Sequence, residues 1–360
     1  MKKIFLIIAA ILVLALSACN NNKSNKEQVN NEETETSDVA QNEVEDEDTV
    51  IETEEEIDVS NIKVRALDTC YIAGNTAYEY YGFNTGFATA YAENVKAAAK
   101  IAGDDTQIYT VLIPTPMDVT LPAALRETIT NTSDQAEAIK FMYDSIGDCA
   151  NNVWILDNLR KHKSEYLYFR TDHHWTALGA YYAYQELAKA MGITPNKLSD
   201  YEKVEFDGFL GSFYQHTEAP ELKEKPDTVV AYVPMSTNKM SFTDKDGNVV
   251  GWSIIKDVSD WNAGSKYNTF IGGDNPYSVI ENPDLNDGSS CLVLKESLGN
   301  ALVPFLVDHY QTVHVIDYRH YKGSLSSFLE ENQVDDIIFL NYLSAAVSST
   351  NTEKMANFVK

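Results

Sequence analysis

The order in which apolar and helical segments follow one another constrains the fold of this 360-residue chain most strongly. Short runs rich in aliphatic and β-branched residues predict strands at 108–113, 153–156, 166–169, 291–294, 312–316 and 337–340. Segments with helical spacing lie between them, at 87–102, 136–146, 177–191, 300–309 and 324–332. Strands that alternate with helices favour an α/β fold with a mostly parallel sheet covered on both faces.

The pattern changes between residues 216 and 268. Predicted strands at 229–232, 240–242 and 249–255 follow one another without helices, and Asp246-Gly247 has the composition of a hairpin turn. We therefore expect an antiparallel β insertion at 216–268 within a domain that covers residues 59–360.

The first nineteen residues have the pattern expected of a bacterial lipoprotein signal. Lys2 and Lys3 precede an apolar run from 4 to 16, and Leu16-Ser17-Ala18-Cys19 looks like a lipobox. The run is shorter than the roughly 20 residues of a spanning helix. We expect Cys19 to become the mature N-terminus, modified with lipid such as palmitate, although an ordinary secretory signal with an incidental Cys is the alternative.

Residues 20–58 are predicted to be a disordered acidic tether. They contain fifteen Asp and Glu against two Lys and no aromatic residue, so their apolar surface cannot offset the entropy of ordering. A spacer across a wall or capsule layer and a solubilising leader are both consistent with this composition.

Charge excludes one class of partner for the rest of the chain. Residues 59–360 carry a net charge of −15 of the −26 for the whole chain, and an acidic surface argues against nucleic acid. Cys70, Cys149 and Cys291 are an odd number without metal-ligand spacing. A disulfide between Cys70 and Cys149 is one option, and Cys291 is expected to be buried.

The segment Thr171-Asp172-His173-His174-Trp175 combines an acid and two imidazoles. It follows the predicted strand 166–169 and precedes a predicted helix, which is where open α/β sheets place ligand crevices. Residues i and i+2 of an extended turn share a face, so we expect Asp172 and His174 to converge and His173 to point away. A polar turn whose side chains only pack is the alternative interpretation.

Ser297 occupies a second predicted turn between a strand and a helix. Such a turn exposes the hydroxyl, and backbone N–H groups at the helix start can hold an oxyanion. Ser also caps helices, so an isolated Ser would be interpreted as a cap. Asp172 and His174, at another strand end of the same sheet, would supply the acid and base that a Ser nucleophile needs.

These segments resemble the DHHW family of bacterial cell-surface proteins, which are relatives of the SGNH-like alginate O-acetyltransferases. The resemblance rests on the TDHHW segment, the turn at 295–300 and residues 316–319, with further matches at 112–115 and 208–214, and spans about 65–350. It implies an SGNH hydrolase-like three-layer sandwich in which the D-x-H motif precedes the Ser.

The resemblance also implies roles for individual residues. Ser297 would be the nucleophile and one amide donor to the oxyanion, His174 the general base, and Asp172 the acid that orients it. Arg319 and Tyr318 would contact the substrate or the oxyanion, although a surface ion pair is the alternative for Arg319.

The implied function is acetyl transfer to a cell-surface or secreted polysaccharide. A membrane-bound O-acyltransferase would deliver the acyl group, and the protein would sit on the extracytoplasmic face of the cell membrane through lipid on Cys19. A carbohydrate esterase with the same triad and a non-catalytic glycan-binding lipoprotein are the alternatives. We expect no cofactor, and no metal held by His162, His173 and His174, because adjacent His side chains diverge.

Overall fold

The computed structural model of the protein describes residues 58–360. The predicted signal peptide, Cys19 and all of the acidic tether except Asp58 lie outside the described residues. Within the described part, no helix is both long and apolar enough to cross a membrane.

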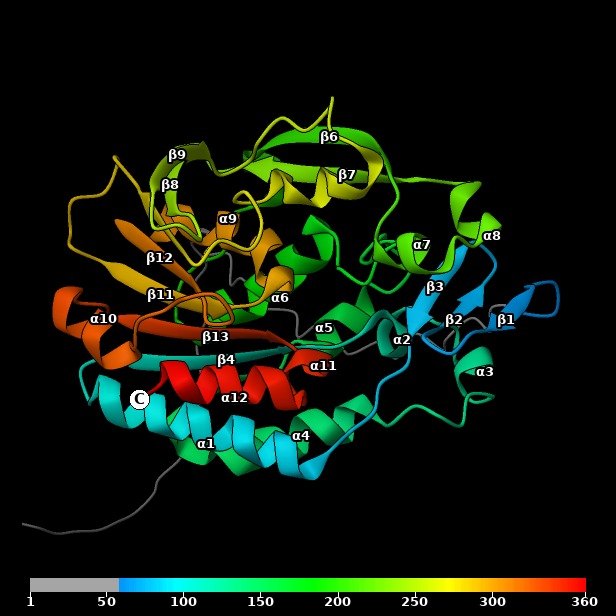
Figure 1. Cartoon of the computed structure of the whole chain (residues 1–360), viewed down its shortest axis with the longest axis horizontal. Coiled ribbons are helices and arrows are strands. Elements are labelled where there is room, and N and C mark those ends of the chain that lie inside the picture. Colours follow the sequence, from blue (N-terminus) through cyan, green and yellow to red (C-terminus); the bar gives the residue numbers. More distant parts are fainter. Residues whose placement is uncertain (1–57) are drawn as a thin grey trace, which may run out of the picture. The chain divides into compact units, whose positions relative to one another are not determined.

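The central sheet contains eight strands in the order β5-β4-β13-β11-β12-β10-β8-β9 (Figure 1). In that order the strands are β5 Asn151–Val153, β4 Gln107–Ile113, β13 Asp336–Tyr342, β11 Ser290–Lys295, β12 Thr312–Asp317, β10 Tyr277–Glu281, β8 Lys239–Thr243 and β9 Val249–Ser253. The first five are parallel, and the last three add antiparallel pairs at one edge. The predicted mostly parallel sheet is therefore confirmed.

Helices cover both faces of this sheet (Figure 1). One face carries α1 Thr85–Ala102, α4 Gln135–Ile146 and α12 Ser349–Phe358, and the other carries α5 Leu156–Lys161, α6 Ala177–Ala190 and α9 Val303–Leu306. Every residue of β11 is buried, because helices lie over both of its faces.

Shorter helices connect or flank these layers. They are α2 Pro116–Val119, α3 Ala123–Arg126, α7 Ser212–Thr217, α8 Pro220–Lys223, α10 Leu325–Glu331 and α11 Leu343–Ala346. The 3-10 helices are η1 Gly147–Cys149, η2 Leu198–Asp200, η3 Ala263–Thr269, η4 Ser297–Ala301 and η5 Val307–His309.

Side-chain caps explain where the two long helices begin. Asn84 Oδ1 accepts a hydrogen bond from the Phe87 N–H at 3.1 Å, and the Thr176 hydroxyl accepts one from the Gly179 N–H at 3.3 Å. The second cap matters for the site, because it starts α6 directly after the TDHHW segment.

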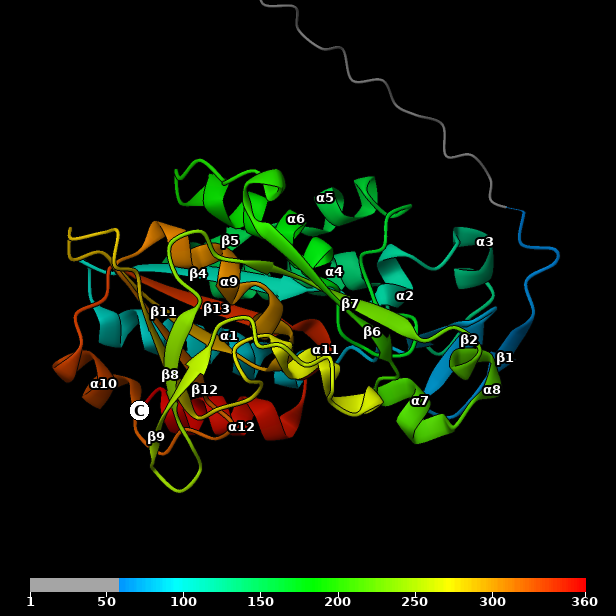
Figure 2. The same cartoon turned by 90° about the horizontal axis from the view of Figure 1, so that it is seen from above.

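Two further antiparallel units lie outside the central sheet (Figure 2). The first contains β1 Val64–Ala66, β2 Cys70–Ala73 and β3 Thr76–Glu79, and the second pairs β6 Glu202–Phe209 with β7 Asp227–Val233. The predicted hairpin turn at Asp246-Gly247 does join β8 to β9. The strands predicted within 216–268 correspond to β7, β8 and β9, and all three make antiparallel pairs: β8 and β9 extend the central sheet through β10, and β7 pairs with β6, which begins before residue 216.

Two predicted strands differ from the structure. Residues 166–169 do not join a sheet and make one isolated bridge, between Tyr168 and Trp175. The reason is local, since the Thr176 N–H donates to the Leu167 carbonyl and folds the segment back on the motif. The second strand, predicted at 153–156, ends at Val153, and α5 begins at Leu156.

The three cysteines of the described residues are free thiols. Cys70 and Cys291 are buried and Cys149 is exposed, so the suggested Cys70–Cys149 disulfide is not formed. The expected burial of Cys291, within β11, is confirmed.

Candidate active site

The TDHHW segment is anchored by a buried acid that the sequence did not point to. Asp227, at the start of β7, accepts hydrogen bonds from the Thr171 N–H at 2.9 Å and from the Thr171 hydroxyl at 2.6 Å. It also accepts a bond from the Tyr166 hydroxyl and pairs with Arg170 at 3.0 Å. Asp227 therefore holds Thr171 in place and shapes the turn that carries Asp172 and the two histidines after it.

Asp172 is buried, and both of its carboxylate oxygens are occupied. Oδ1 accepts the His174 N–H at 2.9 Å and contacts His174 Nδ1, while Oδ2 accepts the Ser212 N–H at 2.6 Å. Burial alone would raise the Asp172 pKa, but the adjacent His174 and His173 rings and these hydrogen bonds lower it below its ordinary value. Asp172 is therefore held as a carboxylate.

Gly211 makes room for this carboxylate. A Cβ at position 211 would lie 2.2 Å from Asp172 Cβ and 2.2 Å from Asp172 Oδ2. Only glycine leaves the space for Asp172 to reach the Ser212 amide.

His174 links the acid to the serine. Its Nδ1 contacts Asp172 Oδ1, and its Nε2 lies 2.8 Å from Ser297 Oγ. Ser297 is the first residue of η4, directly after the short connection from β11, and its side chain is only partly buried. The structure thus brings the three side chains together, although His174 and Ser297 lie 123 residues apart in the sequence.

Two aromatic residues fix the relative positions of His174 and Ser297. The Tyr267 ring stacks on the His174 ring at 3.8 Å between centroids, and its hydroxyl donates to the Ser297 carbonyl at 3.1 Å. Trp175 Nε1 donates to the Leu298 carbonyl at 2.8 Å. The sequence marked Trp175 through its motif, whereas no sequence signal pointed to Tyr267.

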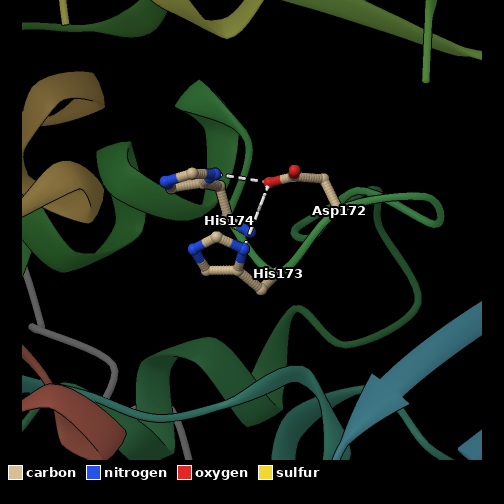
Figure 3. Close-up of side chains that lie close together, drawn as sticks. All are labelled: Asp172, His173 and His174. Atoms are coloured by element: carbon tan, nitrogen blue, oxygen red, sulfur yellow. Dashed lines mark hydrogen bonds and ion pairs between the residues drawn. The ribbon is translucent and has the colours of Figure 1, made fainter. Parts of the chain in front are cut away.

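His173 does not point away from the site as predicted. Its ring lies 4.0 Å from the His174 ring, and its Nδ1 lies 2.7 Å from Ser212 Oγ. Burial, and then the charge of His174, lower the His173 pKa to about 4, so the ring is neutral at physiological pH. The turn is tighter than an extended segment, and this places both imidazoles beside Asp172 (Figure 3).

Glu296, directly before Ser297, holds the serine turn in place through its carboxylate. Its Oε1 accepts the Tyr342 N–H at 2.7 Å, and its Oε2 accepts the Leu298 N–H at 3.2 Å. The carboxyl group thus ties the end of β13 to η4 and caps that 3-10 helix. Burial raises the Glu296 pKa to about 7, against the opposing effect of the Arg319 charge.

A further acid, Glu79, is half-buried at the end of β3. The neighbouring Ala77 N–H donates to the Arg170 carbonyl at 2.9 Å, so β3 runs along the TDHHW segment. Glu79 Oε1 is buried and has no hydrogen-bond partner in the described part of the chain. Burial, and then the negative charges of Asp172 and Glu296, raise the Glu79 pKa to about 8.

A charged network lies beside the serine turn. Lys295, only 1% exposed, contacts Asp274 at 3.2 Å, and Asn300 Nδ2 donates to the same Asp274 oxygen at 3.1 Å. The Arg319 guanidinium donates to the other Asp274 oxygen at 2.8 Å and makes two hydrogen bonds to Asp317. Arg319 thus forms ion pairs, but not the exposed surface pair that the sequence left open as the alternative, because its Asp317 partner is fully buried.

Tyr318 does not lie where the sequence placed it. Its side chain is 3% exposed, and its hydroxyl accepts a hydrogen bond from Asn341 Nδ2 at 3.5 Å. The chain turns directly after β12, where the His320 and Tyr321 N–H groups donate to the Asp317 carbonyl, and this turn buries Tyr318 while Arg319 stays partly exposed. Tyr318 belongs to the core.

Asp172, His173 and His174 each offer an atom that could ligate a metal, and these atoms lie within 4.8 Å of one another (Figure 3). The Asp172 and His174 atoms are, however, already in direct contact with each other, so an ion would have to break that hydrogen bond. His162 lies apart from this cluster and pairs with Glu165 at 2.7 Å. The arrangement suits proton transfer better than metal binding.

The chain is similar to known proteins in both sequence and structure. The family model described as DHHW protein matches residues 11–316. A DHHW family protein from Eubacterium siraeum has a similar structure, with a TM-score of 0.74 and 26% identity over 82% of this chain and 97% of that one. No curated protein matches the sequence.

Two structures of Bacillus cereus PatB1 share the fold. The first, with a sulfonyl adduct, has a TM-score of 0.63 and 17% identity, over 81% of this chain and 98% of that one. The second has a TM-score of 0.62 and 19% identity, over 81% of this chain and 99% of that one. The SGNH hydrolase-like α/β sandwich expected from the sequence is confirmed.

Proposed function

The chain belongs to the DHHW family, and we propose that it transfers an acyl group, normally acetyl, to a cell-surface or secreted polysaccharide. The observation that carries the proposal is the hydrogen-bonded series from Asp172 through His174 to Ser297 Oγ, with 2.8 Å at its last step. A base in reach of a hydroxyl, oriented in turn by a carboxylate, is what an acyl-accepting serine requires.

In the first half-reaction, Ser297 Oγ attacks the carbonyl carbon of the acyl donor, and His174 Nε2 takes the hydroxyl proton. The carbonyl oxygen becomes an oxyanion in the tetrahedral intermediate, and the Ser297 amide is a donor suited to hold it. The bond to the leaving group then breaks, the leaving group takes the proton from His174, and acyl-Ser297 is formed. Asp172 keeps the Nδ1–H of His174 directed toward itself throughout.

In the second half-reaction, a sugar hydroxyl attacks the acyl-Ser297 carbonyl carbon and gives its proton to His174 Nε2. The bond from Ser297 Oγ to the acyl carbon breaks, and the proton returns to Ser297. The products are an O-acylated sugar and the original enzyme, so no oxidant, reductant or cofactor is required.

The cellular setting is part of the proposal. Lipid on Cys19 would hold the protein on the extracytoplasmic face of the cell membrane, and the acidic tether would extend the domain toward its polymer. A membrane-bound O-acyltransferase is the partner we propose as the acyl source, because activated acyl donors are made inside the cell.

Two alternatives concern the same residues. A carbohydrate esterase would use water as the acceptor in the second half-reaction, and a glycan-binding lipoprotein would bind sugars without acylation. The position of Ser297 Oγ at 2.8 Å from the base favours either enzyme over the binding protein.

The test uses residues 59–360 and the full chain with p-nitrophenyl acetate and a sulfonyl fluoride. We expect both reagents to modify Ser297, as located by peptide mass spectrometry, and Ser297→Ala to remain unmodified. Chelation with EDTA should leave the rate of p-nitrophenol release unchanged. Modification elsewhere in the wild type, with Ser297 intact, would contradict the proposal.

The molecule that accepts the acyl group, a sugar or water, distinguishes a transferase from an esterase. Wild-type protein is given p-nitrophenyl acetate with and without oligosaccharides, and acetylated sugar is measured beside released acetate. We expect acetylated sugar at the expense of acetate, whereas release of acetate alone, together with removal of acetyl groups from acetylated sugars, would favour the esterase.

A further inference from the structure

A cavity of about 790 Å³ opens on the β12 side of the site. Its walls are the turn between β8 and β9, at 244–247, the loop after β12, at 319–323, and parts of β10 and α10. These segments are far apart in the sequence, and the antiparallel edge of the sheet brings them together.

The sheet register places this cavity at the same edge of the sheet as Ser297. Lys295 of β11 and Asp317 of β12 are paired in parallel register, and Ser297 and Arg319 each follow two residues later. The two strands therefore end at the same edge of the sheet, and the residues that follow them, Ser297 in η4 and Arg319 in the turn after β12, belong to that edge. Arg319 lines the cavity, and Asp274 connects it to Lys295 and Asn300 on either side of Ser297.

The cavity presents aromatic side chains that are held in place. Tyr277 and Tyr321 are half-buried, with ring centroids 6.4 Å apart, and the Tyr277 hydroxyl lies 2.8 Å from His314 Nδ1. The Tyr321 ring lies against the backbone of Gly323, where a Cβ would come within 2.6 Å of Tyr321 Cε1. Rigid, partly exposed tyrosines combine an apolar face with a polar edge, which is the surface that a sugar ring requires.

The charged groups around the cavity balance one another. Lys245, Arg319 and Lys322 line it with Asp244, Asp246 and Glu331. Arg319 Nε and Nη2 are engaged by Asp317 and Asp274, which orients the guanidinium at the cavity wall. Balanced charges favour a neutral, hydroxyl-rich ligand over a polyanion or a polycation.

We propose that this cavity is the acceptor subsite, which binds a neutral hexose of the polysaccharide adjacent to the sugar whose hydroxyl is acylated at Ser297. The inference rests on the proposed function, and it adds the acceptor class and the residues that recognise it. Tyr321 is the stacking platform, and Arg319 donates hydrogen bonds to the ligand.

The first experiment measures binding without chemistry. Ser297→Ala protein is titrated with cellotetraose, N-acetylchitotetraose, tetragalacturonate and the chitosan tetramer, by calorimetry. We expect one of the two neutral tetrasaccharides to bind most tightly, and Tyr321→Ala in the same background to weaken that binding by about tenfold, the loss of one stacking contact.

Two further variants control for folding. Gly323→Ala keeps every aromatic atom but displaces the Tyr321 ring, and it should weaken binding as well. Tyr182→Ala removes a half-buried tyrosine on α6, which stacks on His162 outside the cavity, and it should leave binding unchanged. Melting temperatures identify any variant that has lost its fold.

The second experiment keeps Ser297 and separates the two half-reactions. Tyr321→Ala should raise the KM for the tetrasaccharide by about tenfold, while the rate of acylation by p-nitrophenyl acetate stays at the wild-type value. No binding of any tetrasaccharide, tightest binding of a charged one, or binding that neither Tyr321→Ala nor Gly323→Ala weakens would each overturn the subsite. A wild-type protein that binds the neutral tetrasaccharide through Tyr321 but never forms acyl-Ser297 would overturn the proposed function and leave the subsite standing.

Discussion

At the scale of single residues, the Ser297 hydroxyl contacts His174 Nε2, whereas Glu296 provides the cap of η4. Removing the hydroxyl should therefore cost the fold little. For Ser297→Ala we expect a loss of activity of about 10⁴-fold or more and a change in the free energy of unfolding of at most about 1 kcal/mol. Rates of acetyl release and urea denaturation measure the two effects.

His174→Ala should reduce activity almost as much as Ser297→Ala, because the three residues act as a unit. Activity of Ser297→Ala within a factor of a few of the wild type would mean that another nucleophile carries the reaction.

His173 contacts both the His174 ring and the Ser212 hydroxyl, whose backbone amide donates to Asp172. A His173 side chain that pointed away from the site, as the sequence predicted, would make His173→Ala affect folding more than chemistry. From the structure we expect a reduction in kcat of about tenfold, because the variant loosens groups that orient Asp172. Steady-state kinetics on p-nitrophenyl acetate check this, and an unchanged kcat with a lowered melting temperature would restore the earlier interpretation.

The Glu79 carboxyl, whose Oε1 is buried, should make stability depend on pH. Its pKa is raised from 4.5 to about 8, so its contribution to stability is complete below pH 4.5 and is lost as the pH rises toward 8. Glu79→Gln removes the ionisation. We therefore expect the melting temperature of Glu79→Gln, relative to that of the wild type, to increase from pH 5 to pH 9.

The exposed Glu353 on α12 provides the matched control for this measurement. Glu353→Gln should show a difference from the wild type that does not vary over the same pH range. A Glu79→Gln difference that is equally flat would show that Glu79 does not titrate in the folded protein with a raised pKa.

At the scale of elements, the start of α7 packs closely against the TDHHW turn, because Gly211 has no Cβ to collide with Asp172. Gly211→Ala would place an atom 2.2 Å from Asp172 Cβ, so the carboxylate must move. We expect activity to fall by about 100-fold, as for a misplacement of roughly 1 Å in a catalytic group. Kinetics together with circular dichroism, which reports the fold, measure the effect.

Gly251 offers a control for Gly211, because a Cβ there meets no atom within 4 Å. Gly251→Ala on β9 should retain wild-type activity. If Gly211→Ala also retains it, Asp172 tolerates displacement and its role in orienting His174 is smaller than proposed.

At the scale of the whole molecule, the anchor and the catalytic unit are expected to be independent. Cys19→Ala removes the predicted lipid attachment without touching residues 59–360. We expect the variant protein to leave the membrane fraction for the soluble fraction, with unchanged melting temperature and unchanged esterase activity. Fractionation and immunoblotting measure the release, and a Cys19→Ala protein that still sediments with membranes would contradict the lipoprotein interpretation.

The sequence by itself determined the α/β class and the residues of the candidate triad. Apolar runs such as 108–113 and 337–340 identify buried parallel strands, because both faces of such strands exclude water. Ser297 was found from its place between a predicted strand and a predicted helix, and Asp172 and His174 were found from their residue types and their place before a predicted helix, although the strand predicted before them joins no sheet. These properties are local, and a local pattern suffices to predict them.

Only the tertiary structure decided what surrounds those three residues. Asp227, Tyr267, Asp274 and Glu79 come from four different segments, and nothing beside them in the sequence indicates that they meet at the site. The same holds for His173, which an extended turn would direct away from the site, and for Tyr318, which the turn after β12 buries. Packing brings distant segments together and selects one of two faces for each side chain. Neither outcome can be predicted from the spacing of neighbouring residues alone.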